Sequence, residues 1–196
     1  MTQPQTIALA LAEERNAAAA EQIKAGPPQA AFGAIFEQYY ERVFRYIRYR
    51  VTCEYTAEDL TSQVFERVWS RFASFREDKA PFEVWLFAIA RNAVNDYGRQ
   101  QRRRRFFSLE ALKSAASSGD TPEAMALAGE AKDNLLEAMS VLKPKERSIV
   151  ALKFGADLKN GEIAKLAGMS ESNVGVTLYR SMKKLKAELE RKGCHE

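Results

Sequence analysis

Residues 158 to 185, LKNGEIAKLAGMSESNVGVTLYRSMKKL, decide the fold of this chain. The stretch is typical of a short helix, a glycine turn and a longer basic helix, which together make a helix-turn-helix. Gly168 can adopt the left-handed conformation that the turn needs. Ser170 can cap the longer helix by accepting a hydrogen bond from a backbone amide two or three residues on. The sequence therefore predicts two packed helices at the C-terminal end of the chain.

The longer of these helices has two contrasting faces. Its apolar residues recur at helical spacing and predict a buried stripe of Val174, Leu178, Met182 and Leu185. Polar and basic residues are left to face outward, as on a helix that enters the major groove of DNA: Asn173, Thr177, Arg180, Ser181 and Lys184. A basic outer face is also common on helices that only meet solvent, so this stretch alone does not decide between the two.

The composition predicts an all-α protein with a polyanionic partner. The chain has 196 residues, 46% of them hydrophobic, with 10 Gly and 6 Pro, which suits one large or two small helical domains. Its net charge is only +4, but residues 91 to 105 hold six arginines and one acid, Asp96. Such clustering beside a near-neutral remainder suggests nucleic acid as a partner.

Several other classes of protein are not indicated. Cys194 and His195 are too few ligands for a structural zinc site, and no metal or other cofactor is expected. No glycine loop for phosphates and no Cys/His arrangement for catalysis is present, so an enzyme is not expected. No apolar run reaches the ~20 residues of a membrane span. The first residues lack the basic region of a secretory signal, so none is expected. We expect a cytoplasmic protein without membrane insertion.

The helical periodicity divides the chain into segments. Residues 1 to 28 are an N-terminal extension that ends at a double proline, and 29 to 105 form a first domain of three long helices. Residues 106 to 129 are a linker, because periodicity is lost over 106 to 120, and 130 to 196 form the second domain. Fifteen extended residues reach ~50 Å, so we expect a flexible tether between two separate domains.

The first domain carries two features of interest. Thr56 is predicted to cap its second helix, with Leu60, Val64, Val68 and Trp69 inward and polar residues outward. Pro81 is predicted to open the third helix, which follows an aromatic loop and runs into arginines. Aromatic side chains beside arginines suit single-stranded DNA, where unstacked bases lie on the rings, although Phe75, Phe82 and Trp85 could equally be core.

At this point the chain resembles the bacterial sigma factors of the extracytoplasmic-function group, the compact members with two conserved domains. The resemblance covers residues 32 to 189. The matching stretches in order are FEQYYERVFRYIRYRV, AEDLTSQVFERVWSRF, FEVWLFAIARNAVNDYGRQQRR, LKPKERSIVALKF and GEIAKLAGMSESNVGVTLYRSMKKLK. A family of this kind implies a transcription initiation factor that binds RNA polymerase core, promoter DNA and an anti-sigma factor.

The resemblance implies three sets of binding residues. The set that would dock on polymerase core is Asp59, Leu60, Gln63, Phe65 and Glu66. For the minus-ten element the family's motif positions are Arg91, Asn92, Asp96 and Arg99. The aromatic and arginine residues noted above complete this set: Phe75, Phe82, Trp85, Arg102 and Arg103. The set for the minus-thirty-five element is Ser170, Ser172, Asn173, Val176, Thr177, Tyr179, Arg180, Lys183 and Lys184.

The sequence departs from the family pattern in two places. Lys159-Asn160-Gly161 replaces a Ser or Thr and an aromatic, so the first helix of the helix-turn-helix is expected to be weakly capped and to start late. The start of the second helix lacks its usual basic residues, which leaves Arg180, Lys183 and Lys184 to carry more of the DNA contact. The alternative is a two-domain repressor or activator that never meets polymerase core, which would leave the acidic second helix without a role.

Overall fold

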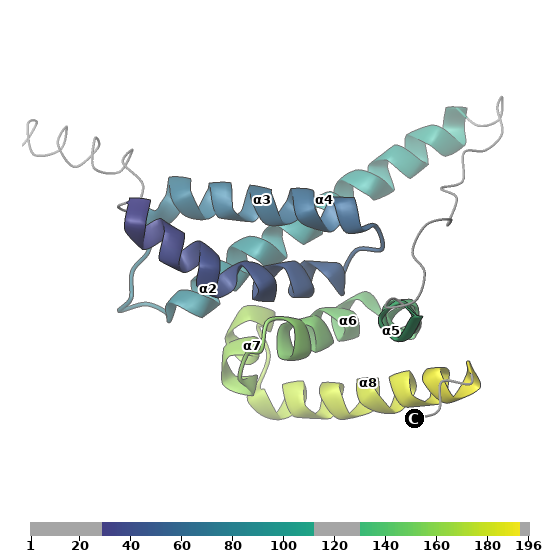
Figure 1. Ribbon diagram of the computed structural model, residues 1–196. Helices are drawn as coiled ribbons and strands as arrows, with labels where there is room; N and C mark the ends of the chain where they lie inside the picture. The colour runs from purple at the N-terminus through teal and green to yellow at the C-terminus, as the bar shows by residue number, and fades with distance from the viewer. Residues whose placement is uncertain (1–28, 112–129, 193–196) are drawn as a thin grey trace, which may run out of the picture.

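The computed structural model of the chain describes residues 29 to 111 and 130 to 192, and every regular element in these ranges is helical (Figure 1). The first domain consists of α2 (Gln29–Arg48), α3 (Glu54–Arg71), a 3-10 turn (Phe72–Ser74) and α4 (Phe82–Ala111). Helix α3 packs against both α2 and α4. The fold class predicted from composition and periodicity is confirmed.

Two helix boundaries in the first domain differ from the prediction. Helix α3 begins at Glu54 with Cys53 as its extended N-cap residue, so Thr56 lies within the helix and does not cap it. Pro81 immediately precedes α4 and accepts a hydrogen bond from the Trp85 amide at 3.2 Å. At its other end α4 continues to Ala111, so residues 106 to 111, predicted as the start of the linker, are helical.

The second domain is a small bundle closed by the helix-turn-helix. It contains α5 (Glu130–Ala138), a 3-10 turn (Met139–Val141), α6 (Pro144–Val150), a π-helical segment η3 (Ala151–Gly155), α7 (Asn160–Ala167) and α8 (Glu171–Arg191). Helices α5, α6 and α7 all pack on α8.

The turn between α7 and α8 forms as the sequence predicts. Gly168 is left-handed at φ 64° and ψ 47°, and the Ser170 hydroxyl accepts the Asn173 amide at 3.2 Å. The late start expected for α7 is not observed. The Glu162 carboxylate accepts the Lys159 amide at 2.7 Å, and this bond caps the helix at Asn160 without a Ser or Thr.

Two residues of α8 differ in burial from the prediction. Ser181, expected outward, is fully buried, whereas Met182, expected in the buried stripe, is 43% exposed. Residues seven apart on an α-helix return to within about 20° of each other, and residues eight apart diverge by about 80°. Ser181 therefore shares the line of Val174, and the buried stripe is Val174, Leu178, Ser181 and Leu185.

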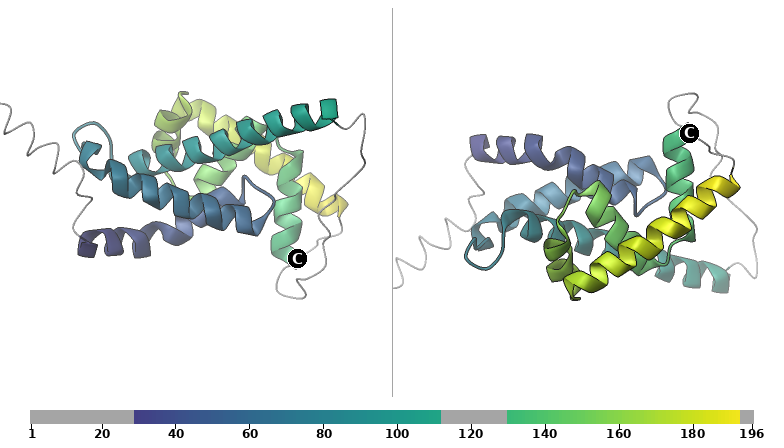
Figure 2. Two further views of the ribbon diagram at one scale, coloured as in Figure 1. Left: turned by 90° about the horizontal axis from the view of Figure 1, so that it is seen from above. Right: turned by 90° about the horizontal axis from the view of Figure 1, so that it is seen from below.

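The two domains pack directly on each other. Helices α6 and α7 lie between the layer of α2 to α4 and helix α8 (Figure 1), and two further views show the same arrangement (Figure 2). A single cluster of buried side chains runs through both domains, from Tyr46 and Phe87 to Leu152, Leu158 and Ile163. The two expected domains are therefore both present, and in this structure they share a core.

Some expectations lie outside the described residues. These concern the N-terminal extension, the part of the linker over residues 112 to 129, and the pair Cys194 and His195.

Candidate nucleic-acid interface

The outer face of α8 is an exposed, largely polar surface of the second domain. Most of the residues predicted for the minus-thirty-five element lie open to solvent on it: Ser170, Ser172, Asn173, Val176, Tyr179, Arg180 and Lys183. Thr177 is half-buried, and its hydroxyl donates to the Asn173 carbonyl at 2.7 Å. The face is therefore presented by the glycine turn and the serine cap without cover from the first domain.

The basic residues of this face differ in how they are held. Lys184 Nζ lies 2.7 and 3.0 Å from the two carboxylate oxygens of Glu146 on α6. This hydrogen bond, together with the Lys143 amide, lowers the pKa of the Glu146 carboxyl. Arg180 and Lys183 line a groove beside them and make no hydrogen bond or ion pair within the described part of the chain. Arg180 and Lys183 are thus the cations available to DNA, while Lys184 is tied to the bundle.

The aromatic loop and the start of α4 form a cluster of rings. Phe75, Phe82 and Trp85 lie 5.3 to 5.6 Å apart between ring centroids, with Phe72 beside them at 6.4 to 6.5 Å. All four rings are half-buried. The sequence left open whether these residues belong to the core or contact bases. In the structure each ring packs on its neighbours and keeps an exposed part.

The polar residues along α4 are only partly available. Asn92 and Arg103 are exposed, and Asp96 pairs with Arg99 at 2.8 Å and with Arg67 of α3 at 3.9 Å. Arg91 instead donates to the Leu166 carbonyl of α7 at 2.6 Å. One residue of the predicted minus-ten set is therefore engaged by the second domain.

Arg102 lines a cavity between the domains. Arg50 from the end of α2 and Arg147 from α6 line the same cavity. Burial and the charge of Arg50 lower the pKa of the Arg147 guanidinium. The cavity is therefore positively charged, with guanidinium groups from both domains.

The predicted docking face on α3 divides into exposed and buried residues. Asp59, Gln63 and Glu66 are exposed, whereas Leu60 and Phe65 are 4% and 3% exposed. The two buried residues can support such a surface but cannot offer their side chains to a partner. The face thus presents carboxylates and an amide over an apolar base.

An apolar groove lies beside Glu66 that sequence reasoning missed. It is lined by Phe32, Phe36, Ser62, Phe65, Glu66 and Trp69, with Phe36 39% and Trp69 37% exposed. Helical spacing assigned Trp69 to the inner stripe. Its exposure could not be read from spacing, because it depends on where α2 begins against α3.

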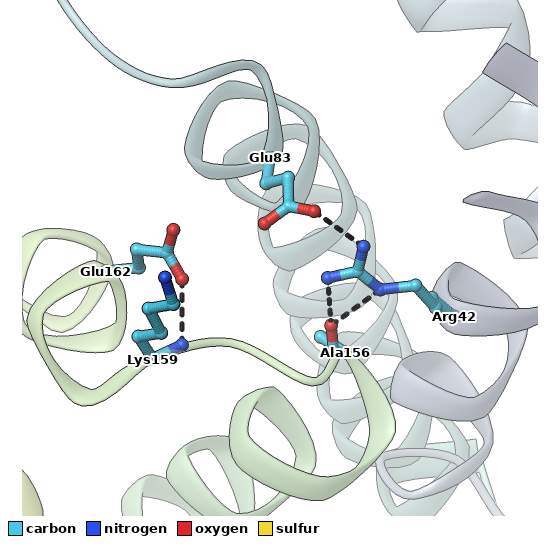
Figure 3. Close-up of polar contacts among 5 residues, drawn as sticks. All are labelled: Arg42, Glu83, Ala156, Lys159 and Glu162. Carbon is cyan, nitrogen blue, oxygen red and sulfur yellow. Dashed lines mark hydrogen bonds and ion pairs between the residues drawn. The ribbon is translucent and has the colours of Figure 1, made fainter. Parts of the chain in front are cut away.

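Polar contacts that join the domains were also missed. Arg42 of α2 donates through Nε and Nη2 to the Ala156 carbonyl, at 3.0 and 2.7 Å, and through Nη1 to Glu83 of α4 at 2.6 Å (Figure 3). Arg50 donates to Ser148 Oγ of α6 at 2.8 Å and to Asn95 Oδ1 of α4 at 3.2 Å. None of these pairs is close in sequence.

No helix in the described ranges is long and apolar enough to cross a membrane.

Two solved structures share this fold. The sigma factor RpoE, in complex with the anti-sigma factor NepR from Bartonella quintana, aligns with a TM-score of 0.63 at 17% identity over 82% of this chain and 97% of that chain. CnrH, in complex with the cytosolic domain of CnrY, aligns with a TM-score of 0.61 at 24% identity over 88% and 96% of the two chains.

Curated relatives are similar in sequence over most of this chain. The ECF RNA polymerase sigma factor BldN of Streptomyces coelicolor is 35% identical over 79% of this chain, a match that spans 59% of its own length. SigD of Mycobacterium tuberculosis strain H37Rv is 30% identical over 75% of this chain and 71% of its own. SigM of Bacillus subtilis is 28% identical over 78% of this chain and 91% of its own.

Two family profiles match the two domains separately. Residues 35–104 match sigma-70 region 2 and residues 132–185 match sigma-70 region 4. The first match covers the bundle of α2, α3 and most of α4, and the second covers α5 to most of α8. On these matches and the identity with SigD, the chain belongs to the family of ECF RNA polymerase sigma factors.

Proposed function

We propose that this chain directs RNA polymerase core to specific promoters, with the first domain opening the minus-ten element and the second reading the minus-thirty-five element. The observation that carries the proposal is the exposed face of α8, where Arg180 and Lys183 stand beside uncharged polar residues on a capped helix. A helix presented in this way fits the major groove. The chain itself supplies no catalytic chemistry and acts in the cytoplasm.

The first domain contributes a second kind of DNA contact. Half-buried rings at Phe75, Phe82 and Trp85 offer stacking surfaces for unpaired bases, each worth about 1–3 kcal/mol. Asn92, Arg99 and Arg103 lie exposed along the same helix and can hold the backbone phosphates. This combination fits a strand that has been separated from its complement.

Docking on polymerase core is assigned to the exposed face of α3. Asp59, Gln63 and Glu66 supply polar and negative groups, and the adjoining apolar groove with Trp69 offers a surface that a helix of the partner could cover. A basic helix with an apolar edge would match both. The complex of RpoE with the anti-sigma factor NepR supports an anti-sigma factor as a partner of this chain.

The direct test is co-purification of the tagged chain with polymerase core, followed by run-off transcription from promoters of the native host. Asp59→Lys is expected to weaken core binding while helicity by circular dichroism is unchanged. Glu77→Lys, in the loop before α4, serves as the matched control because Glu77 is equally exposed and outside the α3 face.

The alternative function, a repressor or activator that acts without polymerase core, predicts a different result in the co-purification experiment. A chain that binds promoter DNA specifically but never retains polymerase core would be a repressor or activator, and the proposal would then be wrong. Unchanged core affinity in Asp59→Lys would instead show that the α3 face only meets solvent.

A further inference from the structure

The backbones of the two domains come into close contact at Gly155. A Cβ atom on Gly155 of η3 would lie 2.8 Å from Cα and 2.9 Å from N of Tyr46 in α2. The obstructing atoms are backbone, which cannot move aside as a flexible side chain can. The two domains therefore approach along a line that only glycine permits at this position.

Buried apolar and polar groups hold this approach. Tyr46 is completely buried in the core that both domains share. Arg42 joins α2, the Glu83 carboxylate at the start of α4, and the Ala156 carbonyl one residue after Gly155 (Figure 3). A guanidinium that bridges a carboxylate and a carbonyl makes hydrogen bonds strengthened by its charge.

The packed arrangement occupies a group that is predicted to bind the minus-ten element. Arg91, assigned to the minus-ten element, donates its Nη1 hydrogen to the Leu166 carbonyl at 2.6 Å. The carbonyl belongs to α7, the helix that supports the recognition helix. The second domain thus holds one group of the first domain that is predicted to bind DNA.

The packed arrangement also places the two reading helices too close together. Helix α7 packs on both α4 and α8, and packed helices lie 8–10 Å apart between axes. Where both pack on α7, helix α8 is therefore at most about 20 Å from α4. Promoter elements separated by more than one turn of DNA lie upwards of ~35 Å apart. One packed molecule cannot read both elements at once.

The interface also contains a repulsive contact. Arg50, two residues beyond the end of α2, and Arg147 of α6 line one cavity between the domains, and the lining of this cavity includes no carboxylate. Two like charges at a partly desolvated contact oppose closure. The packed form can therefore open when a partner compensates for the lost contacts.

We propose that this chain is autoinhibited by its own second domain, which closes on the first through Gly155, Arg42 and Arg91 and must move away before both promoter elements are read. The proposal rests on the proposed function, because it concerns access to the same DNA surfaces. Polymerase core and promoter would bind the open form and shift the population toward it.

The test compares Gly155→Ala with the wild-type chain and with Gly33→Ala. Gly33 lies in α2 with no atom within 4 Å of an added Cβ, so this control adds the same methyl group without a clash. Small-angle scattering of the full chain is expected to show a radius of gyration about a quarter larger for Gly155→Ala only. With limiting sigma factor, run-off transcription is expected to rise about threefold or more, because a smaller closed fraction raises apparent affinity.

Two results would overturn the inference. One is a helical Gly155→Ala chain with the dimensions of the wild type, since the close approach would then not control closure. The other is a larger chain with no gain in affinity for core and promoter. Wild-type chain that gives no transcript with core refutes the proposed function instead, and the scattering comparison still reports on closure.

A second pair of variants covers the case in which Gly155→Ala loses its helicity. Arg42→Met removes both bonds to the Ala156 carbonyl and keeps an apolar stem near the Tyr39 and Phe87 rings, above which the guanidinium now lies. Glu83→Gln removes the ion pair and leaves the bonds to Ala156. The inference requires that Arg42→Met opens the chain more than Glu83→Gln does, and equal dimensions for both would overturn it.

Discussion

Arg180 is the residue of α8 best placed to read a base. Its side chain is exposed, and no described residue competes for its donors. Arg180→Ala is expected to weaken promoter binding by about 1–3 kcal/mol and to relax preference at one position, as the loss of a bidentate contact to guanine would. Binding to a promoter and to single-position variants of it, measured by fluorescence anisotropy, checks this.

The matched control for Arg180 is Lys186→Ala. Lys186 is exposed on the same helix, but six residues further on it points about 120° away. A loss for Arg180→Ala that is equal across all sequences would identify a phosphate contact, and no loss would remove Arg180 from the interface.

Glu146 fixes the position of α8 against α6 and should do so in a pH-dependent way. Its hydrogen bond from Lys184 is the main reason that its pKa is lowered, with the Lys143 amide second. A lowered folded-state pKa means that the carboxylate stabilises the protein above its unfolded pKa of about 4.5. This contribution is lost as the pH falls through the folded pKa.

Glu146→Gln is therefore expected to cost about 0.5–1 kcal/mol at pH 7 and nothing once the pH is below the folded pKa. Urea unfolding at pH 7 and at pH 3 checks the direction, because the cost should be smaller at pH 3, which lies below the unfolded pKa of about 4.5. Glu190→Gln, whose ion pair with Lys186 is long at 3.8 Å, should change stability little at either pH. A Glu146→Gln cost that persists undiminished at pH 3 would contradict the ionic account.

Replacing glycine by alanine is expected to have opposite effects on stability in the turn before α8 and inside α8. Gly168→Ala places a Cβ at φ 64° with no atom within 4 Å, so its cost of about 1–2 kcal/mol is purely conformational. Gly175→Ala, inside α8 and equally uncrowded, should stabilise by up to about 1 kcal/mol through helix propensity. Thermal unfolding of both variants measures the difference, and equal effects would contradict it.

Helices and their turns could be predicted from the sequence because they depend on neighbours along the chain. The glycine turn at Gly168 and the cap at Ser170 are local, and both are confirmed. The prediction of which α8 residues are buried was partly wrong. Ser181 is polar, and hydrophobic spacing cannot identify a buried serine. Its hydroxyl has no hydrogen-bond partner among the described residues.

The packing between domains left no local pattern to detect. Arg42 and Ala156 are 114 positions apart, and the carbonyl that accepts the hydrogen bond belongs to the backbone, which every residue carries. Gly155 reads as an ordinary helix ending until its distance from Tyr46 is known. A linker of sufficient length suggested separate domains, but length permits separation without requiring it.

The shared core determines how the whole molecule should unfold. Separate domains on a tether would melt independently, whereas a buried cluster that includes Tyr46, Phe87 and Leu152 couples them. We expect calorimetry of the full chain to show one transition whose calorimetric and van't Hoff enthalpies agree. Leu152→Ala, at a position fully buried in η3, is expected to lower stability by about 2–5 kcal/mol and to shift the entire transition.

Gly155→Ala should divide that transition, because it removes the contact through which the domains are coupled and leaves each domain's own packing in place. The first domain keeps the bundle of α2, α3 and α4. The second keeps the cluster of Met139, Leu142, Val150 and Leu185. If wild-type protein instead shows two transitions, with Leu152→Ala moving only one of them, the domains are independent in solution and the shared core contributes little to either.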